Sequence, residues 1–505
     1  MYIEPNSIIK LISNSPLDNT YDHTIYFSSS SNQYRYFNSL VKYTFSNVSY
    51  NRLNRGKFRV ERKADDLYNC NYLMYQNTNF GNKWFYAFIT SVEYVNNITS
   101  EITFEIDVMQ TWFFDCEIES CFVEREHVMN DSIGSNLQPE PVNLGEYTSN
   151  GYSDSGLLDD PVVVLNSNIN AEGEEITPIV AGGIFHGVGF MFANADASGA
   201  KAINGILNRL DGWDEINENI TSCYMYDRHF LDTDHITVTD PASYTISKSK
   251  RYSNLDGYTP KNNKLYTYPY NYLLVTTDSG DSVELHYELF SGSNCRFKIT
   301  GDVSSNPQVI CDPLNYKGCT LYRNERLTLG GFPQCTFNID AFKAWLAQTA
   351  SNPNIPISTA QSAVQGGLAG GGMGAAVGAG SALASTVLGG AIAAINPPTV
   401  KGTASSSVSY AAHTKDFYFF PISVQYDFAK RIDEFFDVYG YAVNEHKIPN
   451  RNGRPHWNYV KCKQTNLVGN APADDVRKIV DIYNHGVTFW KNGSEVGNYG
   501  LDNSI

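Results

Sequence analysis

Residues 84–108 read WFYAFITSVEYVNNITSEITFEIDV and carry the clearest secondary-structure signal in the chain. Two runs, 84–94 and 102–108, alternate between apolar and polar side chains over most of their length, which is the period of a strand with one buried face. Asn96 and Asn97 lie between the runs and tolerate the backbone of a tight turn. The stretch therefore predicts a β-hairpin and indicates a mainly β fold around it.

Short strand candidates bounded by turn residues precede this hairpin. They are His23–Phe27, Lys57–Val60 and Tyr68–Tyr75. We therefore expect residues 1–128 to form an N-terminal β domain. Residues 129–160 are rich in Asn, Ser, Gly and Pro, and they predict an extended arm that crosses to the next region.

Residues 161–339 predict a second β region. One helix is expected within it at 200–211, because the apolar residues Ile203, Ile206, Leu207 and Leu210 fall on one helical face. The strand candidates of this region are Val162–Leu165, Ile176–Val180, Gly183–Phe192, Tyr272–Thr277, Val283–Leu289 and Cys295–Thr300.

The C-terminal region, residues 401–505, mixes strand and helix signals. A strand is expected at 417–421, and amphipathic helices are expected at 429–439 and from about 474 to 483. We expect this region to form an α+β element. The fold class predicted for the whole chain is mainly β with a few helices.

Residues 340–400 combine a short helix, for which Asp340 suits the N-cap, with a long apolar segment. The segment Ala344–Val400 contains no Asp, Glu, Lys or Arg in an otherwise acidic chain. Small residues recur there at every fourth position, which on a helix makes a seam that another helix can approach closely. The residues that we expect to contact a membrane are this seam and the larger apolar residues near it: Gly366, Gly370, Met373, Gly374, Val377, Gly378, Ala382, Leu383, Val387, Leu388, Ile392 and Ile395.

Each Gly inside a helix costs about 1 kcal/mol relative to Ala, so a lone helix of this composition is unfavourable in water. The segment is nevertheless longer than the roughly 20 apolar residues that cross a bilayer, and it carries no charge across. We interpret it as conditionally membrane-active, spanning once as a helix or twice as a hairpin. A flexible Gly/Ala linker is the alternative, although Met373, Val377 and Leu388 are unusual in such linkers.

The formal net charge of −16 excludes a nucleic-acid binder that works by electrostatic attraction, because phosphate contacts require clustered Lys and Arg. The 9 Cys residues stand without CxxC pairs, so we expect reduced, buried thiols in a protein assembled in the cytosol. The N-terminus has no basic region followed by an apolar run, and we expect no signal peptide.

Motifs of catalysis and cofactor binding are missing from the sequence. It contains no GxxxxGK[ST], G-x-S-x-G or H-E-x-x-H pattern, so we expect no enzyme, no cofactor and no metal site. Glu124, Glu126 and His127 are close in sequence, but Glu126 and His127 would point to opposite faces of a strand. Asp232–His235 lacks the remaining spacing of a calcium loop, and we interpret it as a solvated turn.

Three phrases resemble a known family. NKWFYAFI, TFEIDVMQTW and FVEREH within residues 82–127, FNIDAFKAWLAQ at 337–348, and the region from Phe417 through Trp490 are similar to the tail-knob proteins of small short-tailed bacteriophages with protein-primed genomes. Residues 129–330 contain no motif that we could match. In the family, an apolar loop follows the second phrase, as the apolar segment does here.

The resemblance implies tandem β-barrel-like or β-sandwich-like tube domains that assemble into a homo-hexameric ring. It also implies a virion protein of the phage tail tip, whose partners are other tail proteins, the host cytoplasmic membrane and, in passage, the phage DNA. Three alternatives stay open at this point. The apolar segment can be only a plug in a structural tube, the chain can be a pore-forming toxin, or it can be a receptor-binding or wall-degrading tail protein.

Overall fold

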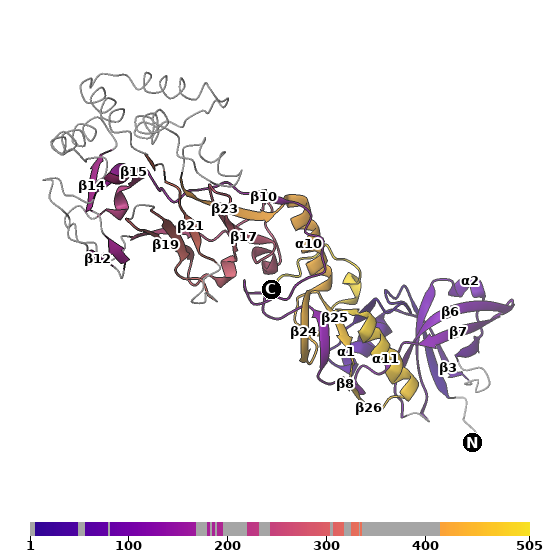
Figure 1. Ribbon diagram of the computed structural model, residues 1–505. Coiled ribbons are helices and arrows are strands. Elements are labelled where there is room, and N and C mark those ends of the chain that lie inside the picture. Colours follow the sequence, from indigo (N-terminus) through magenta and orange to yellow (C-terminus); the bar gives the residue numbers. More distant parts are fainter. Residues whose placement is uncertain are drawn as a thin grey trace, which may run out of the picture. The chain divides into compact units, whose positions relative to one another are not determined.

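The computed structural model is mainly β with a few helices, as the sequence predicts (Figure 1). By contacts, the chain divides into two compact units. The first unit contains residues 1–146, 257–266 and 425–505, and the second contains 147–256 and 267–424. The structure describes residues 6–48, 56–78, 81–167, 179–181, 184–186, 189–194, 220–231, 243–303, 307–317, 325–332, 334–335 and 415–505.

A six-stranded antiparallel sheet forms one part of the first unit. Its hairpin β6–β7 confirms the predicted one: Asn96 pairs with Thr99, so Asn97 and Ile98 form the turn. The hairpin extends beyond the rest of the sheet (Figure 1). In spatial order the strands are β3 (Val41–Val48), β1 (Ser7–Ser13), β5 (Cys70–Gln76), β6 (Phe85–Asn96), β7 (Thr99–Ile106) and β4 (Lys57–Val60).

Both faces of this sheet are covered. On β5, Tyr72 and Met74 belong to one apolar core and Leu73 belongs to another, and all three side chains are 0% exposed. This division follows from the two-residue period of a strand. Each such side chain contributes about 1.5–3 kcal/mol by burial, so β5 stabilises the unit from two sides.

A five-stranded sheet brings the two ends of the chain together in the same unit. The central part of this sheet is antiparallel, whereas β2 pairs with β27 in parallel. The strand β9 pairs with β24 on one side and with β25 on the other. In order the strands are β2 (His23–Ile25), β27 (Val487–Trp490), β25 (Trp457–Lys463), β9 (Cys121–Glu126) and β24 (Tyr441–Lys447).

The two predicted C-terminal helices are present as α10 (Tyr426–Tyr439) and α11 (Ala473–His485). Each helix is followed by a glycine with positive φ, Gly440 (+64°) and Gly486 (+102°). A Cβ at Gly440 would lie 2.2 Å from the backbone oxygen of Glu126, and one at Gly486 would lie 2.0 Å from Tyr459 Oη. Only glycine fits both helix ends.

The remaining elements of the first unit are short. They are α1 (Ser30–Ser39), α2 (Ala64–Leu67), α3 (Val108–Thr111), the pair β8 (Cys116–Ile118) with β26 (Leu467–Gly469), and the 3₁₀ turns η3 (Asn263–Tyr266) and η5 (Gly493–Glu495).

The second unit contains three four-stranded sheets and one pair of strands. The first sheet is β10 (Tyr147–Ser149), β23 (Phe417–Val424), β17 (Asn271–Thr277) and β18 (Ser282–Leu285). The second is β14 (Gly189–Asn194), β11 (Pro161–Ser167), β15 (Ile220–Asp227) and β22 (Gln334–Cys335). The third is β16 (Ser243–Ser249), β19 (Asn294–Gly301), β20 (Val309–Pro313) and β21 (Leu327–Leu329). The pair is β12 (Ile179–Ala181) with β13 (Ile184–His186), and the 3₁₀ turns are η2 (Arg228–Phe230) and η4 (Tyr287–Leu289).

Most predicted strands of this unit are present, with one correction. The strand expected at Val283–Leu289 ends at Leu285, because the chain turns into η4 there. The predicted helices at 200–211 and 340–350 and the turn Asp232–His235 lie outside the described residues. The domain boundaries expected from the sequence remain predictions.

The described residues also show the state of the cysteines and the character of the helices. In the part of the chain that the structure describes, six cysteines are free and buried, in agreement with the sequence: Cys70, Cys116, Cys121, Cys295, Cys311 and Cys462. Within the same residues, none of the helices is both long and apolar enough to cross a membrane.

Asp433 is one of the carboxylates that hold the segment 257–266 in the first unit, together with Asp131 and Glu140. Asp433 on α10 is 1% exposed and accepts hydrogen bonds from Tyr258 Oη (2.8 Å), Lys261 N (2.7 Å) and Asn262 N (3.1 Å). Two of these donors are backbone amides that would otherwise be buried without an acceptor. Asp433 therefore fixes this segment against the helix.

We expect Asp433→Ala to lower the free energy of unfolding by about 3 kcal/mol or more, because it leaves two amides and a hydroxyl without their acceptor. Chemical denaturation of the full chain measures the loss. Glu434→Ala is the matched control, since Glu434 is the next residue on α10 and is exposed. Equal effects of the two substitutions would show that the Asp433 hydrogen bonds do not stabilise the unit.

Candidate functional site

The candidate site is the base of the apolar segment. The residues that we predict to contact a membrane, from Gly366 to Ile395, lie outside the described residues, as does the whole of Ala344–Val400. The structure describes the chain before the segment up to Cys335 and after it from Lys415. Both of these ends belong to the second unit.

The two ends enter different sheets. At the first end, β22 pairs with β15, with Cys335 opposite Cys223. At the other end, β23 lies between β10 and β17, with Phe417 opposite Thr277. Phe332 and Phe417 are 2% and 0% exposed and belong to the same apolar core. Burial of these two rings anchors the chain on either side of the segment.

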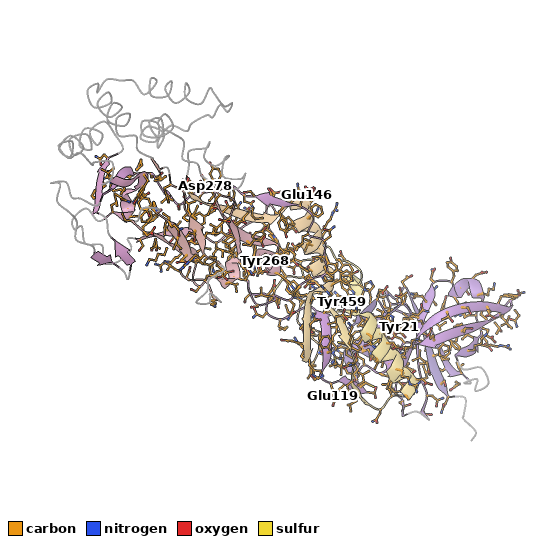
Figure 2. All side chains as sticks on the ribbon, viewed as in Figure 1. Tyr21, Glu119, Glu146, Tyr268, Asp278 and Tyr459 are labelled. Carbon is orange, nitrogen blue, oxygen red and sulfur yellow. The ribbon has the colours of Figure 1, made fainter. Side chains whose placement is uncertain are left out.

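An ion pair holds the second end. Lys415 Nζ lies 3.2 Å from Asp278 Oδ2, and the two side chains are 14% and 4% exposed. Asp278, labelled in Figure 2, follows directly after β17. Burial raises the pKa of Asp278, while the ammonium group of Lys415 opposes this shift. The removal of either partner would leave a charge with little access to water.

The next residue, Asp416, is tied to the loop that follows β10. Its Oδ1 accepts hydrogen bonds from Ser155 N (2.9 Å), from Phe417 N (2.6 Å) and from the Ser155 hydroxyl. The residue is only 6% exposed. Burial raises the pKa of Asp416 to about 6, although these hydrogen bonds act in the opposite direction. At neutral pH a carboxylate is therefore held at this end of the segment at a cost in stability.

Glu124, Glu126 and His127 have structural roles. Glu124 lies within 3.2 Å of the ammonium groups of Lys461 and Lys463. Glu126 accepts hydrogen bonds from Lys447 Nζ (2.6 Å) and Asn450 N (2.6 Å).

His127 is buried, and Tyr459 N donates to its Nδ1, so its Nε2 donates to the backbone oxygen of Asp437. Burial lowers the pKa of His127 to about 3, and the ring stays neutral. The described residues contain no group of three or more His, Cys, Asp and Glu side chains that could hold a metal ion.

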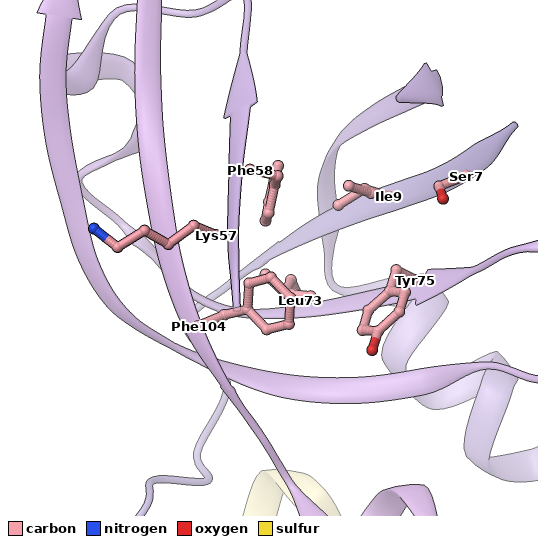
Figure 3. A pocket seen from close by; sticks show the side chains of 7 residues that line it. All are labelled: Ser7, Ile9, Lys57, Phe58, Leu73, Tyr75 and Phe104. Carbon is pink, nitrogen blue, oxygen red and sulfur yellow. The ribbon is translucent and has the colours of Figure 1, made fainter. Parts of the chain in front are cut away.

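A hollow on one face of the six-stranded sheet is too small for a ligand. It lies among Ser7, Phe58, Tyr75 and Phe104 (Figure 3), and its volume is about 10 Å³. This is room for about one water molecule. The hollow does not support a small-molecule site.

The anchoring residues were not predicted from the sequence. Ser155 lies more than 250 residues away from its partner Asp416. One signal was available, since Asp416 is the first acidic residue after Asp340. A carboxylate after so long a stretch without acidic residues marks the return of the chain to the folded unit.

Two family models match the chain. Residues 235–504 match the C-terminal domain of the tail knob protein gp9 of Bacillus phage phi29, and residues 5–117 match the N-terminus of the caudoviral major tail protein. The first match covers more than half of the chain. The chain belongs to the phi29 tail knob protein family. The match also includes residues 235–330, where we had recognised no motif.

Full-length relatives agree with this membership. The tail knob proteins gp9 of Bacillus phages B103 and PZA are each 26% identical to the chain, over 593 and 595 aligned positions, and the alignments cover 98% of both chains. The structure of the tail knob protein gp12 of bacteriophage C1 is similar in fold, with a TM-score of 0.66, 16% identity and 99% of each chain covered. The recognised phrases therefore belong to a similarity that spans the whole tail knob chain.

The raised pKa of Asp416 predicts a pH dependence for this tail knob protein. A carboxyl group whose pKa is higher in the folded state stabilises the fold as the pH falls: the gain is absent above about pH 6 and complete below about pH 3.8. Asp416→Asn keeps the Oδ1 acceptor and removes the titration. We expect its stability advantage over the wild type to be larger at pH 7 than at pH 4.5, by about 2 kcal/mol.

Chemical denaturation at the two pH values measures this difference. Asp474→Asn is the control for the loss of an exposed carboxylate, because the Asp474 side chain is 92% exposed. A difference between Asp416→Asn and the wild type that is the same at both pH values would contradict the prediction.

Proposed function

We propose that this tail knob protein assembles into a hexameric ring at the tip of a phage tail and forms a conduit for genome ejection. In this proposal the apolar segments close the conduit. They leave its mouth during entry and insert into the host cytoplasmic membrane, where they form a passage for DNA. Membership of the family shows that the chain is a structural protein of a phage tail.

The observation that carries the proposal is the segment Ala344–Val400, which has no charged side chain and is rich in glycine. Such a segment is too apolar to be left in water and too glycine-rich to be a stable lone helix. Neighbouring copies can shelter it through close packing along the seam of small residues. Six copies also turn weak individual insertion into strong collective insertion.

The anchors at the base of the segment support the same role. Lys415, Asp416 and Phe417 attach one end, and Phe332 lies at the other, so the segment can leave the unit without unfolding it. The core that contains both phenylalanines includes strands of all three four-stranded sheets. The described contacts of that core therefore hold the chain on both sides of the segment.

Charge is consistent with passage of DNA. Each chain has a formal net charge of −16, so six copies carry about −96. A conduit built from such acidic chains does not bind DNA tightly, because binding of phosphate groups requires clustered Lys and Arg. We propose assembly in the host bacterial cytoplasm, with the finished protein in the virion and contact with other tail proteins.

A second candidate function is a tail tube in which the apolar segment acts only as a plug. The same composition that suits a bilayer also suits a dry interior among copies of the chain. A free pore-forming toxin is less well supported, because the matched relatives are tail knob proteins. The plug and the membrane-active segment differ in one measurable property, the release of contents from lipid vesicles.

We expect deletion of residues 361–394 to leave assembled rings and to abolish leakage from dye-filled liposomes. Electron microscopy measures ring assembly, and dye fluorescence measures leakage. Equal leakage by the wild type and the deletion would contradict insertion, whereas the absence of leakage from both would favour the plug.

A seam variant gives a sharper test of the same proposal. Gly374→Leu with Gly378→Leu blocks close helix approach and should reduce leakage at least tenfold, because packing along small residues is lost. Gly372→Leu with Gly380→Leu is the matched control, since these glycines lie off the seam and add the same apolar bulk. Equal loss in both pairs would show that the seam has no specific role.

A further inference from the structure

Three tyrosines, one histidine and two glutamates meet at the sheet β10-β23-β17-β18 of the second unit. Tyr147 comes from β10, Tyr272 from β17 and Glu284 from β18. Tyr268, labelled in Figure 2, lies in the turn before β17. His286 and Glu288 follow β18. We call these six residues the tyrosine–glutamate site.

The aromatic rings of the site form a continuous surface. The ring of Tyr268 stacks on His286 at 3.8 Å, with an angle of 11° between the planes. Tyr272 contacts Tyr268 at 5.6 Å and Tyr147 at 5.9 Å, both edge to face. Tyr147 and Tyr268 are 42% and 37% exposed. Ring contacts hold these side chains in place, so little conformational freedom remains to be lost when a ligand binds.

The phenol groups lie around one carboxylate. Tyr268 Oη donates a hydrogen bond to Glu284 Oε2 at 3.1 Å. Burial and then the charge of Glu284 raise the pKa of Tyr272 to about 12, and Glu284 also contributes, after burial, to the raised pKa of Tyr147. The hydroxyl groups of three rings therefore stay protonated beside an exposed carboxylate that accepts hydrogen bonds.

A second carboxylate has an oxygen without a donor. Glu288 is 4% exposed, and its Oε1 accepts a hydrogen bond from Tyr268 N at 3.1 Å. Among the residues that the structure describes, no group donates to Glu288 Oε2. His286 Nδ1 lies 3.8 Å from Oε1, beyond hydrogen-bond distance. A buried acceptor that lacks a donor favours a ligand that supplies one.

We propose that the tyrosine–glutamate site binds a neutral saccharide of the bacterial surface. A pyranose ring has an apolar C–H face that packs on aromatic rings, and its hydroxyl groups can both donate to Glu284 or Glu288 and accept from the phenols. The two carboxylates disfavour an anionic polymer, and a purely apolar partner would leave the polar groups unpaired. The site would give the tail knob a recognition role that is separate from the apolar segment.

Binding of defined sugars to the full-length protein tests the proposal. The probes are a tetramer of β-1,4-linked N-acetylglucosamine, a tetramer of α-1,4-linked glucose and, as the anionic comparison, a tetramer of galacturonic acid. We expect calorimetry to detect binding of at least one neutral tetramer and none of the galacturonate. Tyr147→Ala and Glu284→Gln should each weaken that binding about tenfold, through loss of ring contact or of charge.

Tyr152→Ala is the matched control, because Tyr152 is a 69% exposed tyrosine of the same unit that lies beside Phe420 rather than in the site. It should bind as the wild type does. The proposal is wrong if neither neutral tetramer binds at millimolar concentration, or if Tyr152→Ala weakens binding as much as Tyr147→Ala.

Mass photometry and liposome leakage separate this proposal from the ring and the conduit. Tyr147→Ala should leave both the number of copies in the assembly and the leakage unchanged. A change in the number of copies would mean that the surface holds a second copy of the chain, and the saccharide proposal would fail. The test of the proposed function, in which deletion of residues 361–394 abolishes leakage, does not depend on this result.

Discussion

The pairing of β9 with strands from the other end of the chain is the constraint on which the structure depends. Cys121–Glu126 lies between β24 and β25, so residues more than 300 positions apart form the middle of one sheet. Main-chain hydrogen bonds fix this arrangement, and Gly440 permits the close approach of the chain to Glu126. The chain therefore leaves the first unit and returns to it, first for residues 257–266 and again at residue 425, and the second unit consists of residues 147–256 and 267–424.

The apolar segment belongs to the second unit. It begins and ends within the second unit, and the described chain on either side is secured by buried rings and by the charges at Lys415 and Asp416. In the function that we propose, these anchors keep the chain on both sides of the segment attached to the second unit. Asp416 and Asp278 lose favourable hydration in this position, and hydrogen bonds or an ion pair offset that loss.

Local patterns in the sequence predicted local structure well. The hairpin β6–β7 and the helices α10 and α11 depend on period and on turn or cap residues, all of which lie within a short window. Partners distant in sequence could not be predicted in the same way. No pattern in residues 121–126 indicates that β9 lies between two C-terminal strands, and the tyrosines 147 and 272 become neighbours only through β23, which lies between their strands. The contacts of Asp416 and Glu288 are equally dependent on tertiary structure.

The topology of the five-stranded sheet determines when during translation the sheet can be completed. Of its five members, β24, β25 and β27 all lie beyond residue 440, whereas every described strand of the second unit precedes residue 425. During translation the described strands of the second unit can thus be complete while this sheet still lacks three of its five strands. A nascent chain that ends at residue 440 keeps β9 unpaired on both sides, so a premature stop codon there leaves incomplete a sheet whose first strands were synthesised before the second unit.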